Sequence, residues 1–205
     1  MQTPKRQLFT IVMGLCVVAQ LVVYSVQAQR VTPELYFSGG LSFPVSSDAA
    51  PWATGSNFSA GGGLLIGRFV SLNCGVEASR LPFRSIWRPD GVTGGTVSTT
   101  AITAGIELFA RPRIMRPSPR LSIRFGHYRE RVRDAIYVSY GVPYFKGYEV
   151  EGSSLGIGLG ADLRLSYRLS VFGQLRYCIG KPDGRDDLTQ MPLNLGLRCW
   201  PWGGN

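Results

Sequence analysis

The feature that most constrains this chain is a strict alternation of apolar and polar residues with a period of two. Between residues 155 and 165 every odd position is apolar, and the even positions hold Gly156, Gly158, Gly160, Asp162 and Arg164. Successive side chains of a β-strand point to opposite faces of the sheet. The pattern therefore predicts a strand with one apolar and one polar face.

The same alternation recurs in seven further segments: residues 35–43, 59–67, 72–79, 102–108, 121–126, 169–179 and 191–198. Shorter connections at 68–71, 111–119 and 166–168 alternate with longer ones at 46–57, 85–97, 129–152 and 181–189. Short turns at one end, long loops at the other and an even strand number are typical of outer-membrane barrels. The sequence thus predicts an all-β protein, an eight-stranded antiparallel up-and-down transmembrane β-barrel.

The composition of the polar face predicts which side of the sheet is inside. A surface that faces water carries many long charged side chains of both signs. Here the polar positions are mostly Gly, Ser, Thr and Asn. Small residues fit the interior of an eight-stranded barrel, which is just wide enough to be filled by side chains. We therefore expect the apolar face to meet lipid, where a closed sheet leaves no unpaired edge.

Charged residues with the inward parity form a predicted interior charge network: Glu77, Glu107, Arg124, Asp162, Arg164, Arg176 and Arg198. Lone charges in a narrow lumen are costly, so carboxylates and guanidinium groups should pair there. Such pairing predicts a plug that fills the lumen. A narrow, gated path for small solutes is the alternative.

The N-terminus predicts export. Lys5 and Arg6 precede a nearly unbroken apolar stretch from Leu8 to Val26, and Val26-Gln27-Ala28 supplies a small-x-small cleavage pattern. We expect residues 1–28 to be a cleaved signal peptide, with an uncleaved anchor helix as the alternative. Residues 29–205 would then form the barrel domain.

The mature chain is basic, because loss of Lys5 and Arg6 takes the net charge only from +9 to +7. Export argues against nucleic acid as the partner. The polyanions of a bacterial envelope are lipid head groups, so we expect contact with outer-membrane lipids, including anionic glycolipid. Solubility of the loops is an equally weighted explanation of the charge.

The longest predicted loop, residues 129–152, interleaves basic and aromatic side chains. Residues 134–140 and 144–150 predict a hairpin that extends beyond the membrane. Tyr and Arg favour recognition of a partner, although they also form ordinary interfacial belts. The candidate binding surface, for an extracellular partner that the sequence does not identify, is Arg129, Arg131, Arg133, Tyr137, Tyr140, Tyr144 and Tyr148.

Catalytic and metal-binding patterns are weak. Nucleophilic catalysis of the serine type needs a histidine base, and His127, the only histidine, has the outward parity with Arg129 where a His-x-Ser pair would place serine. We expect no enzyme activity and no cofactor, with a lipid-modifying enzyme as the least favoured alternative. The sequence contains no Cys/His cluster, so we expect no metal site. Cys74, Cys178 and Cys199 are expected to act as small hydrophobes, with a Cys178–Cys199 disulfide left open.

The whole mature chain resembles the small outer-membrane barrels of the OmpA and OmpX type. The resemblance lies in the signal peptide, eight alternating strands, glycine-rich inward faces, inward Glu and Arg, and a basic–aromatic final segment at 193–200. It implies insertion into the bacterial outer membrane by the barrel-assembly machinery, which reads a C-terminal aromatic strand. The expected function is that of a non-enzymatic integral barrel that stabilises the envelope or presents extracellular loops for binding.

Overall fold

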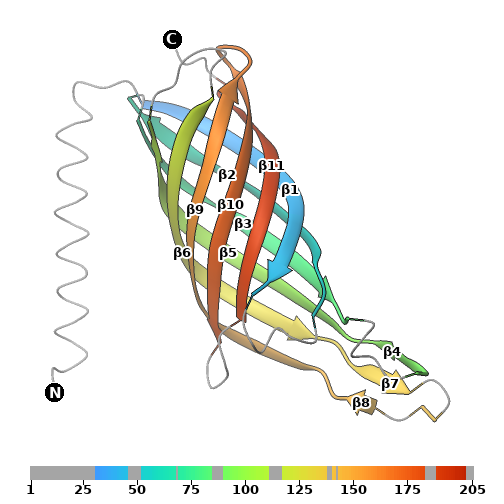
Figure 1. Cartoon of the computed structure of the whole chain (residues 1–205). Coiled ribbons are helices and arrows are strands. Elements are labelled where there is room, and N and C mark those ends of the chain that lie inside the picture. Colours follow the sequence, from blue (N-terminus) through green and yellow to red (C-terminus); the bar gives the residue numbers. More distant parts are fainter. Residues whose placement is uncertain are drawn as a thin grey trace, which may run out of the picture.

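The computed structural model describes residues 31–45, 52–67, 69–84, 90–110, 117–137, 140–141, 143–182 and 188–201. Eight long strands form a closed antiparallel barrel, in which β1 pairs with β11 (Figure 1). These are β1 (Val31–Pro44), β2 (Gly55–Ile66), β3 (Val70–Pro82), β5 (Thr96–Phe109), β6 (Ser118–Val132), β9 (Tyr148–Arg164), β10 (Leu169–Pro182) and β11 (Leu188–Cys199). The predicted eight-stranded barrel is confirmed. The predicted signal peptide, residues 1–28, lies outside the described residues.

Within the described part of the chain, no helix has the length and apolar character needed to cross a membrane.

The two ends of the barrel differ. The short connections at 67–69 and 165–168 lie at the end where β1 begins and β11 finishes, which we call the turn end. The opposite end, where β1 finishes and β11 begins, is the loop end. The predicted alternation of short and long connections holds only in part, because the connection at 110–117 on the turn end is longer than the one at 183–187 on the loop end.

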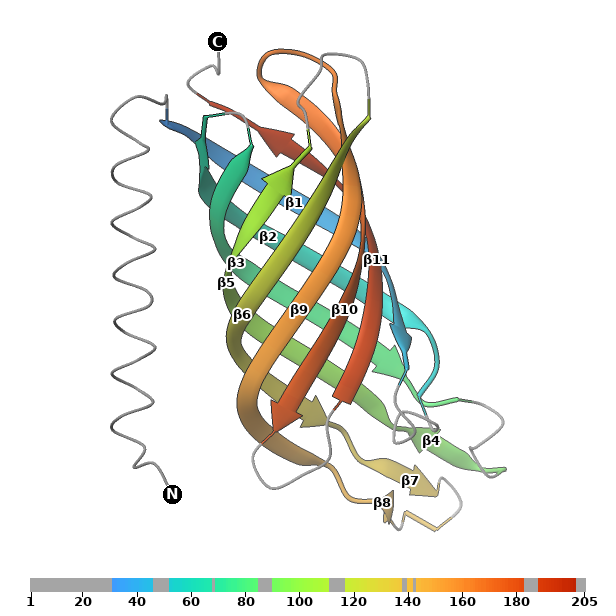
Figure 2. The ribbon, with the colours of Figure 1, turned by 60° about the vertical axis from the view of Figure 1, so that its left-hand side comes forward.

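Three short strands form a second sheet at the loop end, in the order β4 (Val92–Gly94), β7 (Ala135–Tyr137), β8 (Pro143–Phe145). The predicted hairpin is confirmed by the antiparallel pairing of β7 with β8, and Gly141 takes a φ of +60° between them. The sequence pattern does not predict β4, which places Val92 opposite Tyr137. Figures 1 and 2 show this loop-end sheet projecting beyond the barrel.

The strand register determines how far the strands tilt. A row of paired residues starts at Glu34 on β1, passes through Arg124 on β6, and returns to β1 at Pro44. The row has advanced by ten residues along β1, so the strands tilt by roughly 40° from the barrel axis. Residues of equal height on neighbouring strands are therefore shifted by about one residue from the paired row.

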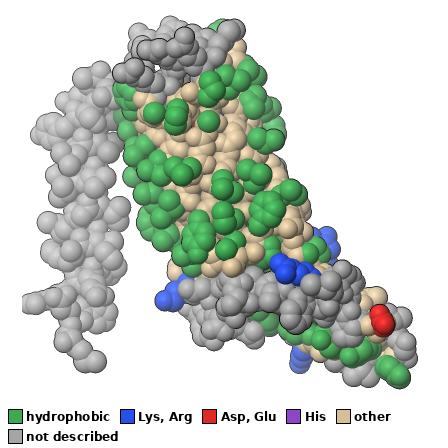
Figure 3. Space-filling view, viewed as in Figure 1, with side chains coloured by type: hydrophobic (Ala, Val, Ile, Leu, Met, Phe, Trp, Pro, Cys, Tyr) green, Lys and Arg blue, Asp and Glu red, His purple; other side chains and the backbone are tan. Residues whose placement is uncertain are grey.

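The burial pattern confirms that the apolar face is outside. Ile102, Leu159 and Leu195 expose 65%, 68% and 69% of their surface, whereas Ser122 and Asn194 are buried. Figure 3 shows hydrophobic side chains over the visible barrel wall. An apolar wall of this extent is the surface that a transmembrane barrel presents to hydrocarbon.

Inward glycines make room for large side chains of neighbouring strands. A Cβ atom on Gly158 would lie 2.4 Å from Cγ of Arg176, and one on Gly180 would lie 2.8 Å from the Tyr128 ring. The outward Gly173 differs, because its nearest neighbour would be a Leu195 methyl at 3.4 Å. The small residues of the polar face are therefore a packing requirement of the filled lumen.

The three described cysteines are free. Cys178 pairs in register with Gln190 and Cys199 with Leu169, so roughly 30 Å of strand separates the two thiols. The disulfide that the sequence left open is therefore wrong for this fold.

Candidate functional site: the lumen and the loop end

A buried carboxylate on β5 is the centre of the interior charge network. Glu107 is fully buried and accepts hydrogen bonds from Arg120 (3.1 Å), Arg124 (2.8 Å) and Arg198. Arg124 also reaches Glu77 at 2.8 Å. Its guanidinium therefore bridges two carboxylates, as the fork of five N–H donors permits.

The network spreads from this centre over most of the barrel. Arg176 on β10 pairs with Glu77, and Arg120 lies 3.5 Å from Asp162. Of the seven residues predicted from sequence, the structure joins six in this way, from β3, β5, β6, β9, β10 and β11.

Arg164, the seventh predicted member, lies at the turn end. It donates hydrogen bonds to the carbonyl oxygens of Ser166 (3.1 Å) and Tyr167 (3.0 Å) and stacks 5.2 Å from the Trp200 ring. It shares the inward parity but sits on the last residue of β9. These contacts of Arg164 close the β9–β10 turn, and its place in the interior charge network stays a prediction.

Two members of the network were missed by the sequence prediction. Glu34 lies 3.5 Å from Arg198 and accepts a 2.5 Å hydrogen bond from Ser71. Arg120 is bound to Glu107 and Asp162. Both have the inward parity and stand one residue outside the predicted strands 35–43 and 121–126. Extending the alternation by one position would have found them.

The paired set carries no net formal charge. Its four carboxylates, Glu34, Glu77, Glu107 and Asp162, face four guanidinium groups, Arg120, Arg124, Arg176 and Arg198. Aromatic rings complete the filling, because Arg120 lies 4.3 Å from the Phe172 ring and Arg198 lies 5.0 Å from Phe109. Balanced and hydrogen-bonded charges are the condition under which burial is tolerated.

Two further layers fill the lumen toward the loop end. Ser42 and Ser79 donate hydrogen bonds to the side-chain carbonyl of Gln190 at 2.8 and 2.9 Å, and a cavity of about 60 Å³ lies between this layer and the ion pairs. A cavity of that size has room for a few water molecules. Beyond it an apolar cluster packs together: Trp52, Leu81, Val97, Val132 and Leu188.

The predicted loop surface does not form a single surface. The pairing of β6 with β9 continues to Val132 and Tyr148, beyond the predicted strand ends. Alternation therefore still sorts these residues by face. Arg129 and Arg131 are exposed on the outer wall, whereas Tyr148 turns inward, donates a 3.1 Å hydrogen bond to Glu130 and packs on the apolar cluster.

The outer wall of β6 and β9 carries its own ion pairs. Arg129 is bound to Glu149, and Arg131 lies 3.9 Å from the same carboxylate. Nε2 of His127 lies 3.6 Å from Glu151, with both side chains more than half exposed. The only histidine thus lies beside an exposed carboxylate on the outer wall. Among the described residues, no group of three or more His, Cys, Asp or Glu side chains could hold a metal ion.

Three of the predicted tyrosines meet in the loop-end sheet. The ring of Tyr137 lies 6.4 Å from Tyr140 and 5.4 Å from Tyr144, both edge to face. Tyr140 exposes 78% of its surface and Tyr144 41%. Arg133 lies in the connection from β6 to this sheet, where its N–H donates to the Thr96 carbonyl. We call Tyr137, Tyr140 and Tyr144 the tyrosine tip.

Comparison with known proteins identifies the fold. No family model matches the chain, and no curated protein sequence does. Among solved structures, Neisserial surface protein A is similar with a TM-score of 0.61 at 16% identity, covering 83% of this chain and 99% of that one. Ail, the attachment invasion locus protein of Yersinia pestis, is similar with a TM-score of 0.51 at 14% identity, covering 82% and 98%. The chain has the fold of the small eight-stranded outer-membrane barrels.

Proposed function

We propose that this chain is a non-enzymatic integral protein of the bacterial outer membrane, whose closed barrel holds the loop-end sheet outside the cell as a binding surface. Export through the predicted signal peptide at residues 1–28 and insertion by the barrel-assembly machinery are part of this proposal. It is supported by the apolar outer wall and by the fold shared with outer-membrane barrels.

The observation that carries the proposal is the contrast between a filled lumen and a projecting sheet. Ion pairs, a polar layer and an apolar cluster occupy the barrel interior. The loop-end sheet, in contrast, projects beyond the barrel (Figure 2), and the Tyr140 and Tyr144 side chains of the tyrosine tip are exposed. Tyrosine supplies rigid amphipathic contact area at a low entropy cost, which favours recognition.

One solved barrel with this fold has attachment in its name. We propose that the loop end of this chain likewise has a binding role. The arrangement gives less support to the narrow pore, because a solute would have to displace all three layers. A purely structural barrel is the competing outcome of the tests below.

The first test measures binding by the full mature chain in lipid nanodiscs, on a panel of immobilised glycans and extracellular proteins. We compare the wild type with Tyr140→Ser/Tyr144→Ser. The matched control is Tyr167→Ser/Tyr177→Ser, which changes two tyrosines that are 55% and 45% exposed but lie away from the tip. We expect at least one ligand to lose roughly tenfold in affinity with the tip variant and to be retained by the control. A panel without any ligand, or equal binding by all three proteins, would favour the structural barrel.

The second test measures single-channel conductance in planar bilayers. Because the lumen is filled, we expect no current steps at neutral pH. Reproducible steps that disappear in a variant of the luminal layers would replace our proposal with the pore.

A further inference from the structure

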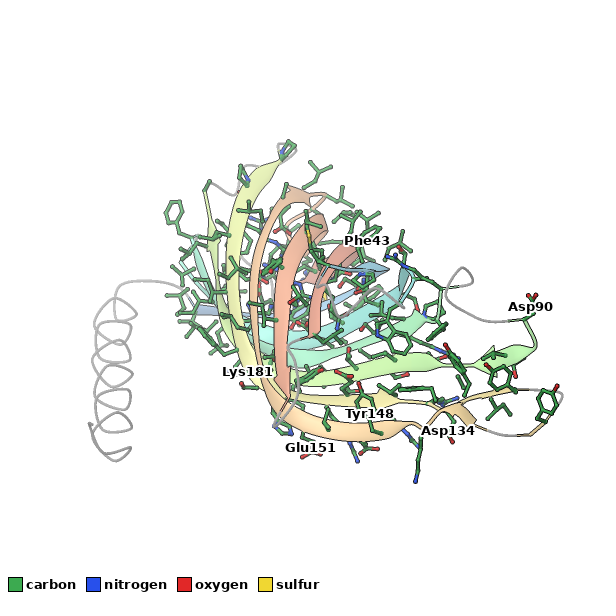
Figure 4. All side chains as sticks on the ribbon, turned by 60° about the horizontal axis from the view of Figure 1, so that its bottom comes forward. Phe43, Asp90, Asp134, Tyr148, Glu151 and Lys181 are labelled. Atoms are coloured by element: carbon green, nitrogen blue, oxygen red, sulfur yellow. The ribbon has the colours of Figure 1, made fainter. Side chains whose placement is uncertain are left out.

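The outer wall changes character at the loop-side border of its apolar surface. Arg80 on β3, Arg129 and Arg131 on β6, and Lys181 on β10 are exposed there. Figure 3 shows basic side chains along the line where the hydrophobic surface ends, and Figure 4 shows Lys181 and Glu151 at the rim of the barrel. We call these four cations the basic border.

Register and tilt bring three of these cations to one height. Arg80 lies on the paired row of Ser98 and Arg131. Because the strands tilt by roughly 40°, a residue at the height of Arg80 two strands away lies about two residues from the paired row. On β6 that residue is Arg129, two residues before Arg131. Lys181 lies on the paired row of His127. His127 stands two residues from Arg129, toward the turn end of β6. The same shift therefore aligns Lys181 with Arg129, and the three cations stand on every second strand.

Within the residues that the structure describes, the border carries charge on one side of the barrel only. At the same height, the described residues of outward parity on β1, β2 and β11 are Phe43, Ser56 and Thr189, which are uncharged; Ser56 is exposed, Phe43 is half-buried and Thr189 is buried. Within the described residues, Arg80 and Lys181 form no ion pair, whereas Arg129 and Arg131 pair with Glu149 and Arg129 also lies 3.7 Å from the exposed Glu151. Two cations are thus free to bind an anion, and two are already oriented.

Apolar side chains lie directly on the turn side of the basic border. Ile102 and Phe125 expose 65% and 61% of their surface, and the register places Ile102 opposite His127. A ligand that contacts both regions needs an anionic head and a hydrocarbon body. That combination is the chemistry of an acidic lipid, and a soluble anion or a nucleic acid supplies only half of it.

We propose that the basic border binds the phosphate groups of an anionic glycolipid in the outer leaflet. The inference rests on the membrane placement proposed above, with the loop end outside. Each Lys or Arg at a charged membrane surface contributes an attraction that falls off within a Debye length. Guanidinium groups add bidentate hydrogen bonds to phosphate oxygens. The barrel would therefore hold such lipids along β3 to β10 and leave the β11–β1–β2 side to other neighbours.

The test measures binding of lipid A, a phosphorylated glycolipid, to the mature chain in neutral detergent by native mass spectrometry. Its dephosphorylated form and inorganic phosphate are separate probes. Wild type is compared with Arg80→Gln, Lys181→Gln and the double variant. The matched control is Arg168→Gln, which removes an exposed cation at the turn end. Arg80→Lys/Lys181→Arg keeps both charges and should retain binding.

We expect roughly fivefold weaker binding of the phosphorylated lipid for each single variant, about 20-fold for the double variant, and little change for the control. Equal binding of both lipids by the wild type, or equal binding by wild type and double variant, would overturn the inference. Competition by inorganic phosphate at the same phosphate concentration would identify a free-phosphate site and also overturn it.

Insertion into vesicles is measured separately, by comparing the gel migration of heated and unheated protein. This measurement distinguishes a failure of the lipid site from a failure of the proposed membrane placement. A protein that inserts into vesicles but shows no phosphate preference contradicts the lipid site alone. A protein that fails to insert contradicts the proposed function as well.

Discussion

Strand β6 carries arginines with two different fates. Arg120 and Arg124 point into the lumen, where the Arg124 side chain is 4% exposed and bound to Glu77 and Glu107. Five positions further along the same strand, the Arg129 side chain is 58% exposed and bound to Glu149. Residue type, partner type and strand are the same. The parity of the position is the difference.

The comparison teaches that one ion pair can be part of the fold or only a surface feature. Inside the lumen, removal of one partner leaves an unpaired charge in a largely buried site, so its cost is large. On the outer wall, water and salt screen the same attraction. The inner pairs should therefore control stability, while the outer pairs remain available to ligands.

The strongest test of the inner ion pairs is Glu107→Gln. Because Arg120, Arg124 and Arg198 all bind this carboxylate, we expect a loss of about 3–5 kcal/mol in the free energy of unfolding. Urea unfolding in detergent, followed by tryptophan fluorescence, measures it. An unchanged urea midpoint would show that the inner pairs are dispensable and that the comparison fails.

Lumen packing is tested by a matched pair of glycines. Gly158→Ala places a methyl group against Arg176, Ser122 and Gln174, whereas Gly173→Ala points outward into ordinary contact distance. We expect a loss of about 1–3 kcal/mol for the first and a change within about 1 kcal/mol for the second. Equal effects in the same unfolding assay would mean that the lumen has space to spare.

Coupling energies distinguish the inner ion pairs from the outer ones without depending on total stability. A double-mutant cycle with Glu77→Gln and Arg176→Gln should give a coupling of about 1–3 kcal/mol, because these side chains are bonded inside the lumen. The cycle with Glu149→Gln and Arg129→Gln should give below about 1 kcal/mol. Similar values from the two cycles would remove the distinction between the faces.

The smallest effect is expected from Glu149→Gln alone. The carboxylate is 37% exposed and pairs with Arg129 and Arg131, so the change in unfolding free energy should stay below about 1 kcal/mol. Because the pair is screened by salt, the difference should disappear at about 0.5 M NaCl. A salt-independent loss would indicate that the outer pairs are buried by a neighbour or by lipid.

Alternation predicted much of this molecule because its period is local. The eight barrel strands, the outward apolar face and six of the network residues follow from parity alone. Strand ends are less well determined, since pairing can continue through residues without a clear pattern. That is why Glu34 and Arg120 were missed and why Tyr148 was placed in a loop.

The loop-end sheet shows a second reason why the sequence pattern missed some elements. The hairpin of β7 and β8 is local and has a turn signal at Gly141. Strand β4 comes from a different connection and pairs with β7 over 40 residues of intervening chain. A three-residue strand carries too little periodicity to be recognised before its partner is known.

Within the strands that the alternation predicted, residue order alone fixed which side chains face the lumen and which face outward, because side-chain direction on a strand depends only on the count of residues. It did not determine which inward charges meet. Arg198 reaches Glu107 across 91 positions of chain, and the three outer cations share one height. Both depend on barrel closure and on the ten-residue advance of the paired row. Closure couples the registers of all eight strands, so these partners exist only in the tertiary structure.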